Sequence, residues 1–119
     1  MSDRLAALVA RSTTKYPGMI SVPEGWEDLV IELDTALAEI DPDYTIFQVK
    51  EKFAGLRYYY HSTKGEQMEP LVQEAEQKSA TICQKCGQPA AQRCKPSGWW
   101  ATLCEAHADG AEIIQEEDD

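Results

Sequence analysis

Two short motifs near the C-terminal end of the chain combine cysteine and histidine at spacings typical of metal ligands. Cys83 and Cys86 are followed by Gly87 in "CQKCG", and Cys104 and His107 close the stretch "WWATLCEAH". Two thiolates separated by two residues reach the same ion, and a glycine tolerates the tight turn after them. The second pair, three residues apart at the start of a helix, lies on one helix face. The four residues therefore predict a Cys₃His site for structural Zn²⁺.

Cys94 lies between the two pairs and is the alternative fourth ligand in place of His107. It has no cysteine or histidine neighbour at metal-binding spacing, so we expect a free thiol there. Disulfides are the other use of cysteines, but they are rare in the reducing cytosol. The sequence shows neither a basic start joined to an apolar run nor about 20 consecutive apolar residues. We therefore expect a cytoplasmic protein with no membrane segment.

A zinc ion with four protein ligands has no open position for water or substrate, so it stabilises the fold and does no chemistry. The sequence has no zinc-deaminase motif, phosphate-binding glycine loop, nucleophile elbow or His-Glu-x-x-His motif. An HNH-type nuclease would need more histidines than His61 and His107. The Cys-x-x-Cys motif lacks the βαβ pattern of a redox protein. The protein is therefore predicted not to be an enzyme.

Three helices are expected to position these motifs, at residues 3–12, from Trp26 onward, and at about 67–82. The second has the clearest helical periodicity, and Ser21 and Glu24 before it have capping-box spacing. Its apolar stripe consists of Trp26, Leu29, Val30, Leu33, Leu37 and Ile40. Trp26 begins the stripe and is expected to anchor the core, because its large apolar surface favours burial.

Residues 44–61, "YTIFQVKEKFAGLRYYYH", are rich in β-branched and aromatic residues and are interrupted by Ala54 and Gly55. This pattern predicts a β-hairpin. A two-residue turn would place Ala54 at positive φ, so a longer loop with Gly55 in the left-handed conformation is expected. Three side chains are expected to point toward the second helix: Phe47, Val49 and Phe53.

These elements together predict an α+β fold in which helices pack on a β-hairpin, followed by a zinc knuckle or treble-clef-like module. A chain of 119 residues suits one domain with one modest core. We expect a helical and β-hairpin region at residues 1–82 and a zinc-binding module with an acidic tail at residues 83–119. The two parts are expected to fold as one compact unit.

The formal net charge is -10, and no basic residue occurs between Lys15 and Lys50. On the second helix, five carboxylates are expected to lie mostly opposite the apolar stripe: Glu27, Asp28, Glu32, Asp34 and Glu39. Such a face is either an ordinary solvated helix surface or an imitation of a phosphate backbone that a partner binds. Phosphate affinity depends on Lys and Arg, so this net charge argues against direct binding of nucleic acid.

A rival surface is predicted on the hairpin, where Lys50, Lys52 and Arg57 accompany several tyrosines. Cations interleaved with aromatic rings stack nucleic-acid bases or meet an acidic partner. Alternatively, these cations pair with local acids such as Glu51 and protect the sheet edge. The zinc module offers three further cations to such a surface: Lys85, Arg93 and Lys95.

Four segments in order, "GWEDLV", "QVKEKFAGLRYYY", "CQKCGQPA" and "GWWATLCEAH", resemble a family of small uncharacterised proteins of phages and bacteria. In that family a VKEKFGGLRFY-like segment precedes a C-x-x-C-G motif and a G-W…T-L-C-x-x-H ending. The resemblance covers roughly residues 25–107. It implies metal binding by Cys83, Cys86, Cys104 and His107, and it implies no activity. Ala54 replaces the family's second glycine, from which we expect a less strained hairpin tip.

These observations lead to the hypothesis of a phage-encoded, non-enzymatic, zinc-stabilised binding protein. Its acidic helix would dock on a host protein and inhibit a nucleic-acid-binding defence complex, as anti-CRISPR and anti-restriction proteins do. The alternative is a nucleic-acid-binding regulatory zinc protein that uses the basic and aromatic hairpin. A third hypothesis is an accessory structural protein whose charge serves only solubility.

Overall fold

The computed structural model describes residues 3–12, 20–89, 91–95, 100–108 and 112–113. The predicted α+β fold class is confirmed, with a cluster of cysteine and histidine side chains in the C-terminal part. The helices lie within about three residues of their expected bounds. In chain order the elements are η1 (Asp3–Leu5), α1 (Ala6–Arg11), η3 (Glu24–Trp26), α2 (Glu27–Ile40), β1 (Thr45–Lys52), β2 (Gly55–His61), α3 (Gly65–Ser79), β3 (Gln92–Lys95), β4 (Ala101–Leu103), α4 (Glu105–Ala108) and β5 (Glu112–Ile113).

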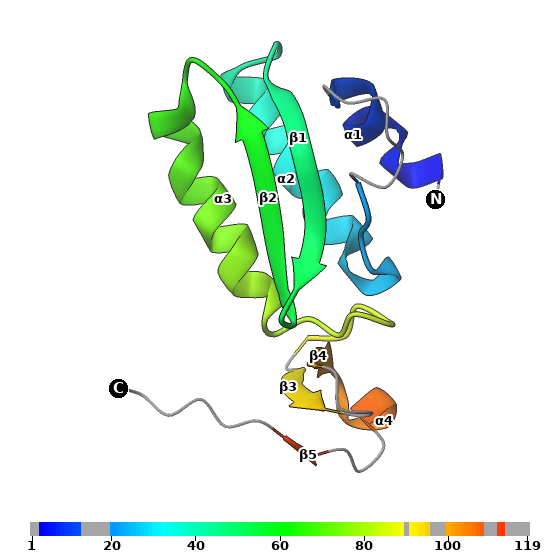
Figure 1. The fold of residues 1–119 in the computed structure, drawn as a ribbon. Coiled ribbons are helices and arrows are strands. Elements are labelled where there is room, and N and C mark those ends of the chain that lie inside the picture. The colour runs from blue at the N-terminus through cyan, green and yellow to red at the C-terminus, as the bar shows by residue number, and fades with distance from the viewer. Residues whose placement is uncertain (1–2, 13–19, 90, 96–99, 109–111, 114–119) are drawn as a thin grey trace.

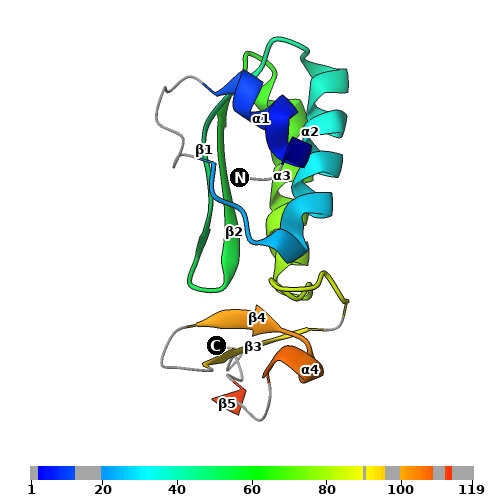
Figure 2. The ribbon, with the colours of Figure 1, turned by 90° about the vertical axis from the view of Figure 1, so that its right-hand side faces the viewer.

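Strands β1 and β2 form an antiparallel sheet, and α1, α2 and α3 all lie on one side of it (Figures 1 and 2). The outer face of the sheet carries no helix or strand of the described part of the chain (Figure 2). A second, three-stranded sheet of order β4-β3-β5 lies beyond the hairpin tip together with α4. Within the described ranges, no helix has the length and apolar character needed to cross a bilayer.

Both edges of the β1-β2 sheet are occupied. On the β2 edge, the Leu56 amide donates to the Ser79 hydroxyl (3.0 Å) and the Tyr58 amide donates to the Glu76 carboxylate (3.0 Å). The β1 edge is met by isolated parallel bridges from the N-terminal segment. Because an added strand needs an open edge, the accessible part of this sheet is its outer face and not its borders.

Trp26 is the anchor of the core, as predicted. Its side chain is fully buried, and its indole N–H donates to the backbone carbonyl of Ile82 (2.8 Å). The rest of the predicted stripe is buried or partly buried against α3 and the inner face of the sheet. The capping box predicted for Ser21 and Glu24 is wrong, because Glu24 begins a 3₁₀ turn and no side chain caps α2.

Two of the five carboxylates expected on the outer face of α2 are buried instead. Glu27 is 7% exposed and Asp34 is 5% exposed. Arg11 of α1 donates to Asp34 (2.7 Å), and the Tyr44 hydroxyl donates to the same carboxylate oxygen. Arg4 lies 3.6 Å from Glu27. The periodicity of α2 could not show this, because it is the N-terminal helix that covers this side of α2 and supplies both arginines.

The predicted inward positions of Phe47 and Phe53 are also wrong. A β-bulge falls between Ile46 and Gln48, so Ile46 and Val49 both point into the core and Phe47 is 45% exposed. Phe53 lies at the hairpin tip and is 63% exposed. A bulge adds one residue to one strand and reverses the alternation beyond it, which a strict period of two does not anticipate.

The hairpin tip is a two-residue turn and not the longer loop that we expected. Phe53 (φ 53°) and Ala54 (φ 66°) are both left-handed, while Gly55 belongs to β2. Alanine is strained in this conformation and glycine is not, so the expectation of a less strained tip is wrong. The Ala54 amide donates to Glu51 (2.7 Å), and its carbonyl accepts a bond from the Thr102 hydroxyl (2.8 Å). Tertiary contacts therefore hold the turn.

Replacing Trp26 tests its role as an anchor. We expect Trp26→Ala to lower the free energy of unfolding by about 3–5 kcal/mol, because it empties a fully buried site. The matched variant Trp26→Phe keeps most of the volume and loses the hydrogen bond to Ile82, at a cost of about 1 kcal/mol. Urea titration followed by circular dichroism measures both values. A near-neutral Trp26→Ala would show that the indole is not a core residue.

Replacing Asp34 tests whether this carboxylate is structural. Asp34→Ala should cost about 2–3 kcal/mol, since Arg11 and the Tyr44 hydroxyl lose a buried acceptor. The control Glu39→Ala removes an exposed carboxylate from the same helix and should change stability by less than about 0.5 kcal/mol. Thermal unfolding of the two variants decides the matter, and equal effects would contradict the burial of Asp34.

Candidate metal centre and binding surface

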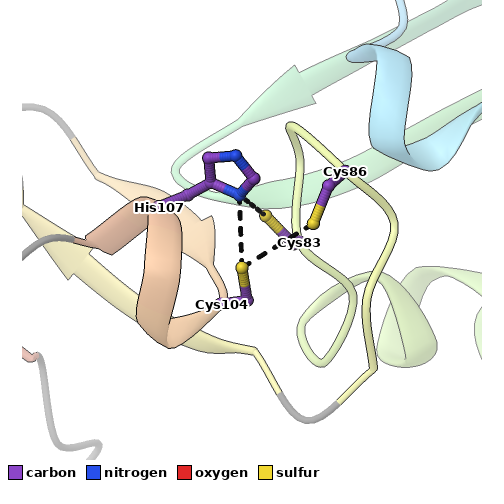
Figure 3. A group of neighbouring side chains, drawn as sticks. All are labelled: Cys83, Cys86, Cys104 and His107. Carbon is purple, nitrogen blue, oxygen red and sulfur yellow. Dashed lines mark hydrogen bonds between the residues drawn. The ribbon is translucent and has the colours of Figure 1, made fainter.

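Four predicted ligands come together where residues 83–88, which we call the knuckle or ligand loop, meet the start of α4. Cys83, Cys86, Cys104 and His107 place their donor atoms within 4.8 Å of one another (Figure 3). The Cys86 and Cys104 sulfurs are 3.7 Å apart, and His107 Nδ1 lies 3.2 Å from the Cys104 sulfur and 3.5 Å from the Cys83 sulfur. The structure thus brings together the four residues that the sequence spacing predicted.

These separations fit a tetrahedral ion. With typical Zn–S and Zn–N bond lengths, a tetrahedral site has sulfur–sulfur edges of about 3.8 Å and sulfur–nitrogen edges of about 3.6 Å. The observed separations of 3.7, 3.5 and 3.2 Å lie close to those edges. Three thiolates and one imidazole are also the donor set that favours zinc over magnesium or calcium. The group therefore has the composition and spacing to hold a metal ion, consistent with zinc.

Local backbone conformation explains why each pair points inward. Gly87 is left-handed (φ 79°), and its amide donates to the carbonyl of Cys83 (2.9 Å), which closes the knuckle. The Cys83 amide donates in turn to Gln88 (2.9 Å). At the second pair, the His107 amide donates to the carbonyl of Cys104 (3.1 Å), the residue directly before α4, and this turn brings the imidazole back toward the cysteine.

The electrostatics of the knuckle favour a thiolate. Burial of Cys83 by itself would raise the pKa of its thiol, but backbone N–H groups of Cys104, Cys86 and Lys85 point at the sulfur. Together these donors outweigh the effect of burial and lower the pKa of Cys83 to about 6. The lowered pKa of Cys83 favours the thiolate, which is the form that a metal ligand needs.

Cys94 lies outside the ligand group, in agreement with the prediction of a free thiol. It is fully buried in β3, within a small apolar cluster that also contains Cys83, Ala91 and Leu103. Burial raises the pKa of Cys94, so the thiol stays neutral. None of the four cysteines, all of which lie in the described ranges, forms a disulfide. Cys94 therefore fills space in a core that is otherwise very small.

The candidate metal centre is in close contact with the main body at Gly25. The Gly25 amide donates to the carbonyl of Gln84 (2.7 Å) inside the knuckle. A Cβ at position 25 would lie 2.0 Å from the carbonyl oxygen of Cys83, so a larger residue at this point would push the knuckle away. Together with the bond from Trp26 to Ile82, this contact joins the start of α2 to the ligand loop.

Comparison with known proteins gives no match: no family model, curated protein or solved structure matches this chain.

The acidic surface of α2 is smaller than predicted. With Glu27 and Asp34 buried, three of the five carboxylates remain exposed: Asp28, Glu32 and Glu39. Asp28 is paired with the guanidinium of Arg4. The N-terminal arginines thus neutralise part of the charge that the sequence placed on this helix.

The hairpin surface keeps its charge. We call it the outer sheet face: Phe47, Gln48, Lys50, Lys52, Arg57, Tyr59 and His61. Lys50 lies directly opposite Arg57 in the register of β1 and β2, and both side chains are on the face turned away from the helices. In the described part of the chain, neither they nor Lys52 form a salt bridge, and the Glu51 carboxylate accepts a bond from the Ala54 amide instead. Pairing with local acids does not occur there.

Sequence reasoning expected tyrosines beside the hairpin cations but placed Phe47 on the opposite face. Tyr59 is 43% exposed and lies opposite Gln48, and Phe47 packs edge-on against His61 with ring centroids 6.5 Å apart. The side chains of Tyr59, Phe47 and His61 also border a shallow groove of about 570 Å³ that extends to α3. Phe47 faces outward because of the bulge between Ile46 and Gln48, and no local sequence pattern indicates that bulge.

The three cations that the sequence assigned to the C-terminal module do not gather on one surface. Arg93 lies over the ring of Trp100, which touches the hairpin tip. Lys85 lines a separate groove beside Arg4 and Glu24. The side chain of Lys95 is outside the described part of the structure. Only Arg93 is thus seen to extend toward the hairpin.

Metal analysis tests the ligand assignment. We expect one equivalent of zinc in the purified protein, retained in Cys94→Ala and lost in His107→Ala. Chelation should unfold the C-terminal module, because its own apolar cluster is too small to hold it together. Mass spectrometry under native conditions and amide hydrogen exchange measure these outcomes. A metal-free but folded module, or zinc lost in Cys94→Ala and kept in His107→Ala, would overturn the assignment.

Proposed function

We propose that this chain is a non-enzymatic, zinc-stabilised protein that binds single-stranded nucleic acid across the outer sheet face. One observation carries the proposal. Among the described residues, Phe47 and Tyr59 of the outer sheet face are two of the five large hydrophobic side chains that are notably exposed, at 45% and 43%. Exposed rings interleaved with cations are the composition of a base-stacking platform.

Charge supports the same surface. Lys50, Lys52 and Arg57 lie beside these rings and are not neutralised by carboxylates of the described chain. A flexible single strand can lay its bases on the rings while its phosphates meet the cations. The chain as a whole has a net charge of -10, which disfavours binding of a strand away from this local cluster of cations. Binding is therefore local and steeply weakened by salt.

Phosphate mimicry by α2 is the second candidate. It is favoured by the exposure of Asp28, Glu32 and Glu39 along one helix and by the absence of basic residues between Lys15 and Lys50. In this version a phage-encoded protein blocks a nucleic-acid-binding defence protein of its host. It ranks second because Arg4 and Arg11 neutralise or cover part of the acidic set.

A gel shift with an oligothymidylate of about twelve nucleotides tests the leading proposal. We expect the zinc-loaded protein to shift the probe at low salt and to release it as salt rises. Lys50→Glu with Arg57→Glu should abolish the shift. The matched control Lys64→Glu with Lys78→Glu makes the same change in net charge on exposed residues away from the face and should bind normally.

Two results would contradict nucleic-acid binding. The first is equal behaviour of the two double variants, which would show a general charge effect. The second is an unshifted probe together with displacement of DNA from a host DNA-binding protein, where the displacement is lost on neutralising Asp28, Glu32 and Glu39. That result would replace the leading proposal with mimicry.

A further inference from the structure

Four side chains from two separate parts of the chain form a row at the junction between the hairpin tip and the zinc module. Lys52 Nζ lies 5.6 Å from the ring centroid of Phe53, and the rings of Phe53 and Trp100 meet edge-on with centroids 6.1 Å apart. The guanidinium of Arg93 lies 5.3 Å from the Trp100 ring. We call this row, Lys52–Phe53–Trp100–Arg93, the junction stack.

The two rings of the junction stack remain accessible although they touch. Phe53 is 63% exposed and Trp100 is 38% exposed. Rings of this size are normally buried when they serve only to hold two parts of a fold together. The row thus offers aromatic surface for stacking, with the ammonium group of Lys52 beside it for phosphate.

The conformation of the hairpin tip depends on the zinc module. Phe53 and Ala54 are both left-handed without being glycine, which costs free energy unless surrounding contacts maintain the turn. The hydroxyl of Thr102 in β4 donates to the Ala54 carbonyl (2.8 Å), and both residues are fully buried. The module thus supplies both Trp100 and the bond that fixes the turn carrying Phe53.

Thr102 is in turn fixed by the ligand loop. The Gln84 amide donates to the Thr102 carbonyl (2.8 Å), and the Thr102 amide donates to the Gln84 side chain (2.6 Å). Gln84 directly follows the ligand Cys83, and Thr102 lies two residues before the ligand Cys104. An ion that draws the two ligand pairs together therefore also sets the position of Thr102 against the hairpin tip.

We propose that the junction stack is a second base-stacking element for single-stranded nucleic acid, assembled only when the zinc module is folded around its metal. This inference rests on the proposed function of the outer sheet face. From Phe47 to the tip, β1 covers about 20 Å at its usual rise per residue, so only a strand of several nucleotides reaches both elements. Metal loading then controls affinity for longer strands.

Fluorescence anisotropy with oligothymidylates of about four and about twelve nucleotides tests this inference on the full zinc-loaded chain. We expect Trp100→Ala to weaken binding of the longer strand roughly tenfold, as loss of one stacking ring does, and to leave the shorter strand nearly unaffected. Trp100→Phe keeps an aromatic ring and should restore most of the affinity. Thr102→Val removes the bond to Ala54 with little change of shape and should act like Trp100→Ala.

Zinc content and circular dichroism of each variant accompany these titrations. Binding of the longer strand that is unchanged in Trp100→Ala and in zinc-loaded Thr102→Val overturns the junction stack and leaves the outer sheet face intact. If Thr102→Val loses zinc, then Trp100→Ala and Trp100→Phe alone decide whether the junction stack binds nucleic acid, because Trp100 lies outside the ligand loop. Failure of the unchanged protein to bind either strand overturns the proposed function and this inference together.

Discussion

The convergence of three thiols and one imidazole is the constraint on which the C-terminal part of this protein depends. Among its described residues, the apolar cluster has four buried members, two of them cysteines, and this is too little burial to fold a segment of this length alone. A shared ion would join the knuckle before β3 to the start of α4 and so close the module from both ends. The donor separations of 3.2 to 3.7 Å suit that task.

The module is in turn joined to the main body by backbone contacts that tolerate little change. Gly25 approaches the knuckle so closely that no side chain fits, and Trp26 beside it reaches Ile82 from within the core. On the other side, Thr102 holds the left-handed hairpin tip. The same few residues therefore position the ligand loop, the start of α2 and the turn between β1 and β2.

The local charge of each surface depends on which charged side chains are paired, and not only on how many there are. The chain has many more acids than bases, yet the arginines of the N-terminal segment form ion pairs with carboxylates of α2, where Asp34 also accepts a bond from Tyr44. The hairpin cations have no such carboxylate partners in the described residues. A strongly anionic protein thus presents a local basic and aromatic face, which net charge alone would not reveal.

The sequence alone determined the features that depend on local periodicity and spacing. The helical stripe beginning at Trp26, the hairpin at residues 44–61 and the Cys₃His ligand set all follow from patterns within a few turns or strands. The position of Cys94 away from the ligands also followed from its lack of a paired neighbour.

Only the tertiary structure decided the rest, because each remaining feature depends on residues distant in the chain. Asp34 is buried since Arg11 and Tyr44 reach it from other elements, and Ala54 adopts a left-handed turn since Thr102 holds it. Phe47 faces outward at the bulge before Gln48 because Ile46 and Val49 are both buried in the core. Burial, strain and register are settled by the whole set of contacts, which no short stretch of sequence contains.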